Sequence, residues 1–297
     1  MKISVCIPMY NESGIIAATA GTLTEALDRR FGEDYELLFS DDGSTDGSAD
    51  LVRQLNLPRV RVVGYEKNRG KGCAVRTAML AAEGDYVMFT DADLAYGTEV
   101  IGRVADAFEA NPDCDVVIGS RNIGKDGYEG YTFMRKIASK TYIRVLCLMG
   151  GFRLSDSQCG CKAFTQRAAK EIFSRCETDG FAFDFEALMW ADQLGYRIKE
   201  LPVRIINHRE SKIRLMRDSM KMLGDLRRIK KRVRRAGRKG KIRISETWKA
   251  EKNPKKRKKL SQNPLQSERK CDIIYPLRKR RQTSAEAERQ SATGAEA

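Results

Sequence analysis

Histidine is nearly absent from this chain: among 297 residues the only one is His208. Ser-His-Asp and Cys-His mechanisms need an imidazole base, so the composition argues against both. The eight cysteines contain no C-x-x-C pair, because Cys159 and Cys161 form C-x-C, and a zinc site of the usual spacing is not expected. Cysteines scattered through apolar runs favour reduced, buried thiols and a cytosolic chain.

Long apolar runs are also absent. No segment reaches the roughly 18 consecutive apolar residues of a membrane-spanning helix. The first residues read KISVCIP, which predicts a strand and not a signal peptide. We therefore expect any membrane contact to be peripheral. The loop DDGSTDGS at residues 41–48 also lacks the G-x-G-x-x-G fingerprint, which argues against a nicotinamide cofactor.

Negative charge is scarce in the last third of the chain. Residues 1–208 carry 25 Lys and Arg against 30 Asp and Glu, whereas residues 209–281 carry 29 against 7, and the net charge is +15. We predict a slightly acidic folded body followed by a basic tail. Because residues 236–297 are poor in aromatics and rich in Lys, Arg, Gln and Ser, we expect them to be largely disordered.

The first 120 residues contain a regular alternation of apolar runs and helical patterns. The pattern predicts strands and helices in turn, with strands at 3–8, 35–40, 59–65, 85–90 and 114–120 and helices at 12–30, after residue 46, at 70–82 and at 98–109. Five strands joined by crossover helices predict an α/β fold with a doubly wound, mostly parallel sheet. The loops at the carboxyl ends of these strands then share one rim, where open α/β sheets bind ligands.

After residue 120 this alternation stops. Helices are expected at 132–151 and 180–195 and a strand-like segment at 196–206, so we predict a helical subdomain packed against the sheet. A basic amphipathic helix is predicted at 212–235, with apolar residues near one face at Ile213, Met216, Met220, Leu223, Leu226 and Ile229. The predicted divisions are a folded domain at 1–211, with halves at 1–120 and 121–211, the helix at 212–235 and a tail at 236–297.

Two acids follow the apolar run at residues 86–89. Asp91 and Asp93 lie in FTDADLAYGTE, at the carboxyl end of a predicted strand. Carboxylates one residue apart repel each other unless a cation, hydrogen-bond donors or protonation compensates them, and such oxygen ligands suit a hard divalent metal. A strand-end turn with an acidic helix cap is the other interpretation of this triplet.

Two further loops on the rim carry polar groups that suit a nucleotide. In DDGSTDGS, Asp41 can accept hydrogen bonds from a base or a ribose and Asp46 can cap the next helix, although a capped turn alone explains the same pattern. In NRGKG, Arg69 and Lys71 precede a helix together with two glycines, which suits either a phosphate or a solvated basic loop.

The rim motifs taken together carry a family resemblance. PMYNES, DDGSTDGS, DADL and GSR, in this order, resemble glycosyltransferase family 2, the inverting sugar-nucleotide enzymes of the GT-A fold. The resemblance runs from Lys2 to about Leu215. Within the family, NRGKGCAVRTAML, DSQCGCKAF and FDFEALM are most similar to dolichyl-phosphate glucosyltransferases, and ELPVRIINHRESKIRL is similar to polyprenyl-phosphate mannose synthases.

This resemblance implies a role for each matching residue. The nucleotide sugar would contact residues of the first half, namely Pro8, Tyr10, Glu12, Asp41, Asp42, Lys71 and Asp91. Asp91 and Asp93 would bind Mg²⁺ or Mn²⁺, which stabilises the nucleoside diphosphate as it leaves. The acceptor would contact Arg121, Arg135, Ser139, Asp156, Gln158 and Lys212. Direct roles in the reaction are implied for Asp91, Asp93, Arg121 and Lys212.

The predicted function is metal-dependent, inverting transfer of a hexose from a nucleotide sugar to a polyprenyl or dolichyl phosphate at the cytoplasmic face of a membrane. UDP-glucose is the favoured donor and GDP-mannose the alternative. A phosphate acceptor is already anionic, so the reaction needs no strong general base. The basic helix would lie on an anionic membrane with its Met, Leu and Ile face toward the acyl chains.

Two other functions remain open at this stage. The first is a soluble family member acting on a sugar hydroxyl, which would need a general base, with Asp156, Asp184 and Glu186 as candidates. The second is a nucleic-acid-binding protein that acts through its basic tail, where PKKRKK offers a cationic run. We expect no specific nucleic-acid partner, and the sequence predicts no oligomeric state.

Overall fold

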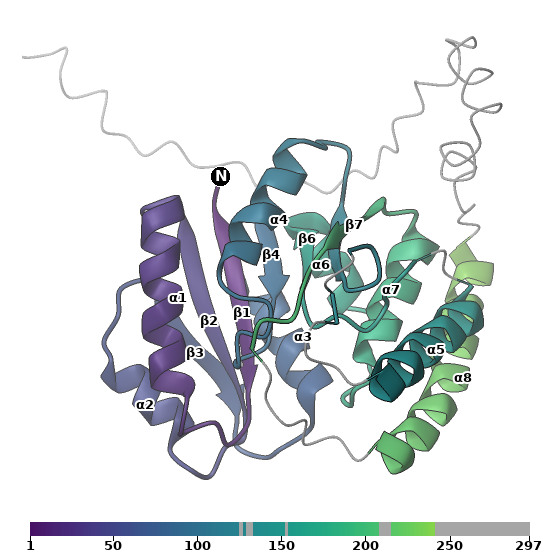
Figure 1. The fold of residues 1–297 in the computed structure, drawn as a ribbon, viewed down its shortest axis with the longest axis horizontal. Coiled ribbons are helices and arrows are strands. Elements are labelled where there is room, and N and C mark those ends of the chain that lie inside the picture. Colours follow the sequence, from purple (N-terminus) through teal and green to yellow (C-terminus); the bar gives the residue numbers. More distant parts are fainter. Residues whose placement is uncertain (125–126, 129–132, 152–153, 208–214, 241–297) are drawn as a thin grey trace, which may run out of the picture. The chain divides into compact units, whose positions relative to one another are not determined.

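A computed structural model of the chain describes residues 1–124, 127–128, 133–151, 154–207 and 215–240 (Figure 1). The strands are β1 (Ile3–Met9), β2 (Tyr35–Asp42), β3 (Val60–Tyr65), β4 (Tyr86–Phe89), β5 (Val116–Ser120), β6 (Lys162–Thr165) and β7 (Ile198–Pro202). The helices are α1 (Ile16–Phe31), α2 (Ser48–Gln54), α3 (Lys71–Ala81), α4 (Glu99–Glu109), α5 (Phe133–Gly150), α6 (Gln166–Phe173), α7 (Phe183–Leu194) and α8 (Leu215–Gly240).

The strands form one mixed sheet in the order β3-β2-β1-β4-β6-β5-β7. Every neighbouring pair is parallel except the two made by β6, which runs antiparallel to β4 and β5. The carboxyl ends of the parallel strands therefore share one edge. Because β6 is reversed, its first residue, Lys162, pairs with Phe89, the last residue of β4. A charged side chain is thus brought to the rim that the parallel strands define.

Helices cover both faces of the sheet (Figure 1), and each face has its own apolar core. Residues of α3, α5, α6, α7 and α8 pack on one face, and residues of α1, α2 and α4 pack on the other. The interior strand β1 contributes to both cores, since Cys6 belongs to the first while Val5 and Ile7 belong to the second. A strand buried on both sides needs a continuous apolar run, which is why ISVCIP shows no alternation.

The expected α/β architecture is confirmed for the first 120 residues, and the strand expected at 196–206 is present as β7. The second half is not only a helical subdomain, however, because β7 and the unpredicted strand β6 both belong to the same sheet. The strand β6 reads KAFT and is only 4 residues long. A run this short, opened by a lysine, shows no strand periodicity, and its pairing on both sides comes from tertiary contacts.

The helix α8 packs on the folded domain. Leu226, Ile229 and Val233 are each at most 1% exposed and belong to the core shared with α7. The expectation that Leu226 and Ile229 face acyl chains is therefore wrong, since the sheet domain already buries them. No helix among the described residues is long and apolar enough to cross a membrane. The predicted domain boundary at residue 211 stays a prediction. The apolar core nevertheless includes residues of α8, which lies after that boundary.

An ion pair fixes α8 to α7. The guanidinium of Arg232 donates hydrogen bonds to Glu186, which is fully buried, and to the Glu177 carboxylate at 3.0 Å. Backbone N–H groups of Glu177 and Thr178 also donate to Glu186, at 3.1 and 2.7 Å. A buried carboxylate is stable only when such partners compensate it.

Replacing Arg232 should destabilise the fold more than replacing its exposed neighbours. Arg232→Met leaves Glu186 with backbone donors but without a countercharge, and we expect the free energy of unfolding to fall by about 2 kcal/mol. Urea denaturation measures the change. Arg234→Met, at an exposed position of the same helix, is the matched control and should change stability by less than about 0.5 kcal/mol. Equal losses in the two variants would contradict the assignment.

Candidate active site

The loops that follow β1 and β2 are tied together by hydrogen bonds. The backbone N–H groups of Asn11 and Glu12 donate to the hydroxyls of Ser44 and Ser48, at 3.0 and 2.9 Å. Ser48 in turn donates from its own backbone to Asp46 at 3.0 Å. The N-cap of α2 (Ser48–Gln54) is Gly47 and has no side-chain cap, so the expectation that Asp46 caps this helix is wrong. Asp46 instead accepts hydrogen bonds from the backbone of Ser48 and Ser13, and so helps to hold the two rim loops together.

These loops bring the predicted base-binding residues together. Pro8 and Asp41 lie near the ends of the paired strands β1 and β2, and Tyr10 and Glu12 follow on the first loop. Tyr10 is 42% exposed, so this aromatic residue is accessible to a ligand. Asp41 accepts a hydrogen bond from the backbone of Ser44 at 3.1 Å and remains partly exposed. An exposed aromatic residue and a carboxylate at neighbouring strand ends suit a nucleobase and ribose.

Asp42 has a different environment from Asp41. Its carboxylate is 3% exposed and accepts hydrogen bonds from the Tyr65 hydroxyl at 2.7 Å and the Asn68 side chain at 2.9 Å. The backbone N–H groups of Arg69 and Gly70 donate to it at 2.8 and 3.0 Å. Asp42 was predicted to contact the nucleotide sugar, but its oxygens are used here to hold the NRGKG loop in place.

Lys71, the first residue of α3, reaches the first acid of the D-A-D triplet. Its Nζ lies 2.5 Å from Asp91 Oδ1. Burial lowers the pKa of Lys71, but the charges of Asp91, Asp184 and Asp93 outweigh burial and raise the pKa above the usual lysine value. Lys71 is therefore a cation at neutral pH. The two sequence motifs NRGKG and DADL, 20 residues apart, meet in one ion pair.

Gly160 closes the other side of Asp91. A Cβ atom added at Gly160 would lie 2.2 Å from Asp91 Oδ2, so only glycine leaves room for the carboxylate. The Gly160 N–H donates to the Tyr96 hydroxyl at 3.2 Å. Leu94 adopts a left-handed φ of 50°, an uncommon conformation for a branched side chain, and so turns the loop sharply between the acids and Tyr96.

The pair Asp91 and Asp93 fits a divalent metal that arrives with a diphosphate. Both carboxylates are partly exposed, and Asp93 accepts a hydrogen bond from the Ala95 backbone at 3.1 Å. The described part of the chain has no group of three His, Cys, Asp or Glu side chains able to enclose a metal. Mg²⁺ commonly needs only one or two protein carboxylates, because phosphate oxygens and water complete its shell.

A buried ion pair lies beneath the acids. Lys162 is 0% exposed, and its Nζ donates to Asp184 Oδ1 and to the Cys159 carbonyl, both at 2.6 Å. The nitrogen also lies 5.7 Å from the centre of the Phe89 ring. Burial raises the pKa of Asp184, and Lys162 opposes this rise. We did not single out Lys162 from the sequence, and the only signal was a lysine inside the apolar segment CGCKAF.

Arg121, at the end of β5, is held by Asp156. Arg121 Nε and Nη2 donate to the two Asp156 oxygens at 2.7 and 3.0 Å, a bidentate pair. Burial lowers the pKa of Arg121, but the hydrogen bonds and charge of Asp156 raise it well above the usual value. The ring of Tyr128 lies 5.7 Å from Arg121 Cζ and 5.6 Å from Lys140 Nζ. Tyr128 and Lys140 were not predicted, because no motif spacing links them to Arg121.

The other residues predicted to bind the acceptor are described in part. Gln158 donates from its backbone to Asp156 at 3.0 Å, which shapes the loop before β6. Ser139 lies partly buried on α5. Arg135 is on the same helix, but its side chain is outside the described atoms, and Lys212 lies outside the described residues. The structure therefore brings Arg121, Asp156 and Gln158 together.

A family model described as "Glycosyl transferase family 2" matches residues 4–173, which is more than half of the chain. The chain belongs to glycosyl transferase family 2. This family 2 chain is 32% identical over 245 residues to the dolichyl-phosphate beta-glucosyltransferase of Saccharomyces cerevisiae, covering 75% of this chain and 72% of that protein. It is 28% identical over 225 residues to the glycosyltransferase AglD of Haloferax volcanii, covering 75% and 36%.

Solved structures of the same fold include glucosyl-3-phosphoglycerate synthase from Mycobacterium tuberculosis in complex with Mn²⁺, UDP-glucose and phosphoglyceric acid. Its TM-score to this family 2 chain is 0.59 at 20% identity, covering 77% of this chain and 79% of that one. The predicted family and enzyme class are thus confirmed: the protein is a glycosyltransferase similar to dolichyl-phosphate beta-glucosyltransferases. The GT-A fold is confirmed as a mixed, mostly parallel sheet.

The buried pair beneath Asp91 should show strong coupling in stability. Lys162→Met leaves Asp184 buried without its countercharge, and we expect a loss of about 3 to 5 kcal/mol in the free energy of unfolding. The double variant Lys162→Met, Asp184→Leu should recover most of that loss, because two apolar side chains need no desolvated partner. Urea denaturation of the single and double variants measures the coupling.

An exposed ion pair provides the control for this cycle. Arg53 and Asp50 lie 2.7 Å apart on α2 with 58% and 70% of their side chains exposed. Arg53→Met should change stability by less than about 1 kcal/mol. If the double variant Lys162→Met, Asp184→Leu were as unstable as Lys162→Met alone, the loss of stability would not come from leaving the Asp184 carboxylate unpaired.

Proposed function

We propose that this family 2 enzyme transfers glucose from UDP-glucose to a polyprenyl or dolichyl phosphate, with inversion at the anomeric carbon. GDP-mannose remains the alternative donor. The names of the similar curated proteins support a lipid phosphate acceptor, since those of Saccharomyces cerevisiae and Dictyostelium discoideum are both dolichyl-phosphate beta-glucosyltransferases. The geometry on the acceptor side supports the same choice.

The observation that carries the proposal is the state of the three carboxylates that could act as a general base. Each is buried and bound to a cation: Asp156 to Arg121, Asp184 to Lys162 and Glu186 to Arg232. A sugar hydroxyl must lose a proton as it attacks, whereas a phosphate monoester carries a nucleophilic anionic oxygen at neutral pH. A site whose candidate bases are all committed to cations therefore favours a phosphate acceptor.

On the acceptor side, Arg121 supplies the positive charge that such a phosphate needs. Two of its donors are used by Asp156, which fixes the guanidinium plane, and a guanidinium has five N–H donors in total. Lys140 adds a second cation, with its Nζ 5.6 Å from the centre of the Tyr128 ring. The acceptor-binding roles of Arg135, Ser139 and Lys212 remain part of this proposal.

On the donor side, Asp91 and Asp93 would hold Mg²⁺ or Mn²⁺, and the metal supplies positive charge to the diphosphate leaving group. Lys71 Nζ lies beside Asp91 and would add a second cation for the diphosphate. Tyr10 and Asp41 orient the nucleoside at the neighbouring strand ends. The anomeric carbon then gains a bond to the acceptor oxygen as its bond to the diphosphate breaks, and UDP leaves with the electron pair.

The acceptor also suggests where the enzyme works. A polyprenyl phosphate is anchored in a bilayer by its chain, so we place the protein at the cytoplasmic face of a membrane, held there peripherally. Residues 1–120 would then bind the donor and residues 121–211 the acceptor.

A nucleotide should stabilise the protein in a metal-dependent way. UDP with Mn²⁺ should raise the melting temperature, by the equivalent of about 2.7 kcal/mol when the ligand is at roughly 100 times its dissociation constant. Asp93→Ala should remove the metal-dependent part of the rise and leave any metal-independent part. GDP serves as the nucleotide control. The absence of any shift with either nucleotide would remove the donor half of the proposal.

A transfer assay tests the whole reaction. Labelled UDP-glucose and GDP-mannose are each incubated with dolichyl or undecaprenyl phosphate in detergent, and label from UDP-glucose should appear on the lipid. Arg121→Lys keeps the charge but loses the bidentate fork, so kcat/KM for the lipid should fall about 100-fold, while KM for UDP-glucose should change by less than about twofold. Label found only on a soluble sugar would favour a hydroxyl acceptor instead.

A further inference from the structure

The helix α5 leaves a row of large apolar side chains in water. Met134, Ile137, Val145 and Leu148 are 73%, 45%, 42% and 74% exposed. Their spacing places them on one side of the helix, because side chains three, four or seven residues apart share a face. We call these four side chains the α5 ridge. Single exposed apolar residues are common on proteins, but two pairs of them on one side of a helix, separated by the exposed Thr141, indicate an interaction surface.

The opposite side of α5 is already used by the fold. Ile143, Leu146 and Cys147 are at most 6% exposed and face the protein. The helix is therefore apolar on two sides, one of which packs in the core while the other does not. Lys140 and Arg144, both exposed, lie along one border of the α5 ridge, three and seven residues after Ile137.

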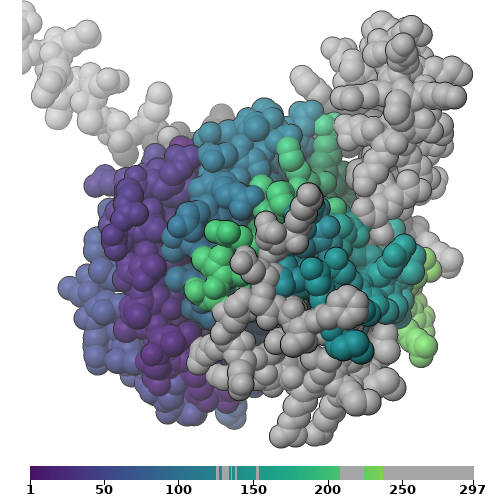
Figure 2. Space-filling model, viewed as in Figure 1, coloured from purple at the N-terminus to yellow at the C-terminus, as the bar shows by residue number. Residues whose placement is uncertain are grey.

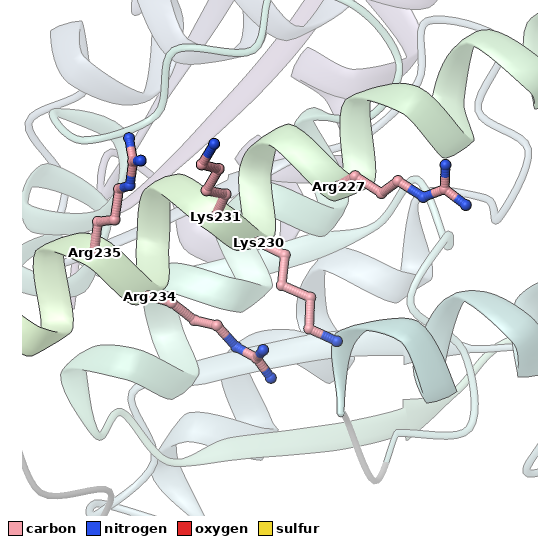
Figure 3. A pocket seen from close by; sticks show the side chains of 5 residues that line it. All are labelled: Arg227, Lys230, Lys231, Arg234 and Arg235. Atoms are coloured by element: carbon pink, nitrogen blue, oxygen red, sulfur yellow. The ribbon is translucent and has the colours of Figure 1, made fainter.

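A group of basic side chains lies beside the ridge on α8. Figure 3 shows five of them lining one hollow: Arg227, Lys230, Lys231, Arg234 and Arg235. We call this group the α8 cluster. Within the described residues none of the five forms an ion pair with an acid, whereas Arg228 and Arg232 of the same helix do. Positive charge therefore accumulates on the exposed side of α8 without compensation.

The two features meet at the end of α5. Lys230 Nζ donates to the carbonyl oxygen of Met149 at 2.5 Å, one residue after Leu148 of the α5 ridge. The two helices lie together at one side of the molecule in Figure 1, and the teal atoms of α5 and the yellow-green atoms of α8 reach the surface there in Figure 2. An apolar row and an uncompensated basic group are thus neighbours.

We propose that the α5 ridge and the α8 cluster together form a surface that docks on an anionic lipid bilayer. Aliphatic side chains enter the boundary between headgroups and acyl chains, and basic side chains bind anionic headgroups, so this pairing has the chemistry of an interfacial helix. A nucleic acid would complement the charge of the α8 cluster. It would not explain the exposed aliphatic side chains, because single-stranded nucleic acids bind proteins by stacking their bases on aromatic rings.

The role of this docking surface in catalysis depends on the proposed function, in which the acceptor is a lipid phosphate. The helix that carries the α5 ridge also carries Lys140, which lies over the Tyr128 ring beside Arg121. Docking through that helix brings the acceptor-binding cations close to the bilayer. A lipid phosphate could then reach Arg121 while its chain stays in the membrane.

Vesicle flotation with the full chain tests the surface. We expect binding to vesicles made of equal parts phosphatidylcholine and phosphatidylglycerol, weak binding to phosphatidylcholine alone, and weaker binding as salt is raised. The ridge variant Ile137→Ser, Leu148→Ser should partition at least about fivefold less, because both side chains lose apolar contact area. The cluster variant Arg227→Gln, Arg234→Gln should lose roughly fivefold for each charge at low salt.

Matched controls use exposed positions away from both helices. Leu80→Ser on α3 is the control for the ridge and Arg167→Gln on α6 the control for the cluster, and neither should change partitioning. Melting temperatures verify that every variant is folded. All six of the altered side chains are exposed, so we expect each variant to change the melting temperature only as much as an ordinary surface substitution does.

Two results would overturn the proposal. The first is a wild-type chain that does not float with the anionic vesicles. The second is a ridge variant that floats as well as the wild type, which would also be the outcome if the basic residues served RNA binding and the ridge had no role. Flotation uses no nucleotide sugar and no acceptor, so its failure is separate from failure of the transfer assay in detergent. Flotation without transfer would leave the surface intact and remove the proposed acceptor.

Discussion

The ion pair between Lys162 and Asp184 joins the reversed strand β6 to the helix α7 beneath the rim. Lys162 begins the reversed strand β6 and holds the Cys159 carbonyl, and the turn that follows puts Gly160 against Asp91. Asp184 lies in the first turn of α7, and the loop before that helix accepts a hydrogen bond from Gly72 at the start of α3. One buried pair thus sets the spacing of three rim segments.

Charges of both signs alternate across this part of the molecule. Lys71 forms an ion pair with Asp91 at the rim, and Lys162 forms one with Asp184 below it. Neither carboxylate is therefore an unpaired charge with reduced access to water. The acceptor side repeats the arrangement with Arg121 and Asp156. Such pairs add little net stability compared with apolar packing, but each fixes a direction for its cation. The rim therefore presents oriented charges to ligands that are themselves anionic.

The features of this arrangement that depend on local sequence pattern could be predicted from the sequence. The succession of short apolar runs and helical patterns located the first five strands, and the position of Asp91 and Asp93 at a strand end followed directly. What the pattern could not reveal depends on contacts between distant segments. The reversal of β6, the inward turn of Asp42 and the approach of Lys140 to Tyr128 have no signature in spacing. The basic helix expected at 212–235 is described at 215–240, yet amphipathicity alone does not tell whether protein or lipid covers its apolar face.

The burial of Leu226, Ile229 and Val233 also sets the smallest piece of this chain that can fold well. A protein shortened to residue 211 would uncover an apolar trough along α7 and leave Glu186 without Arg232. An exposed trough of this kind promotes self-association. The C-terminal limit for producing a stable catalytic domain therefore lies beyond Val233, some distance past the last residue of the family motifs.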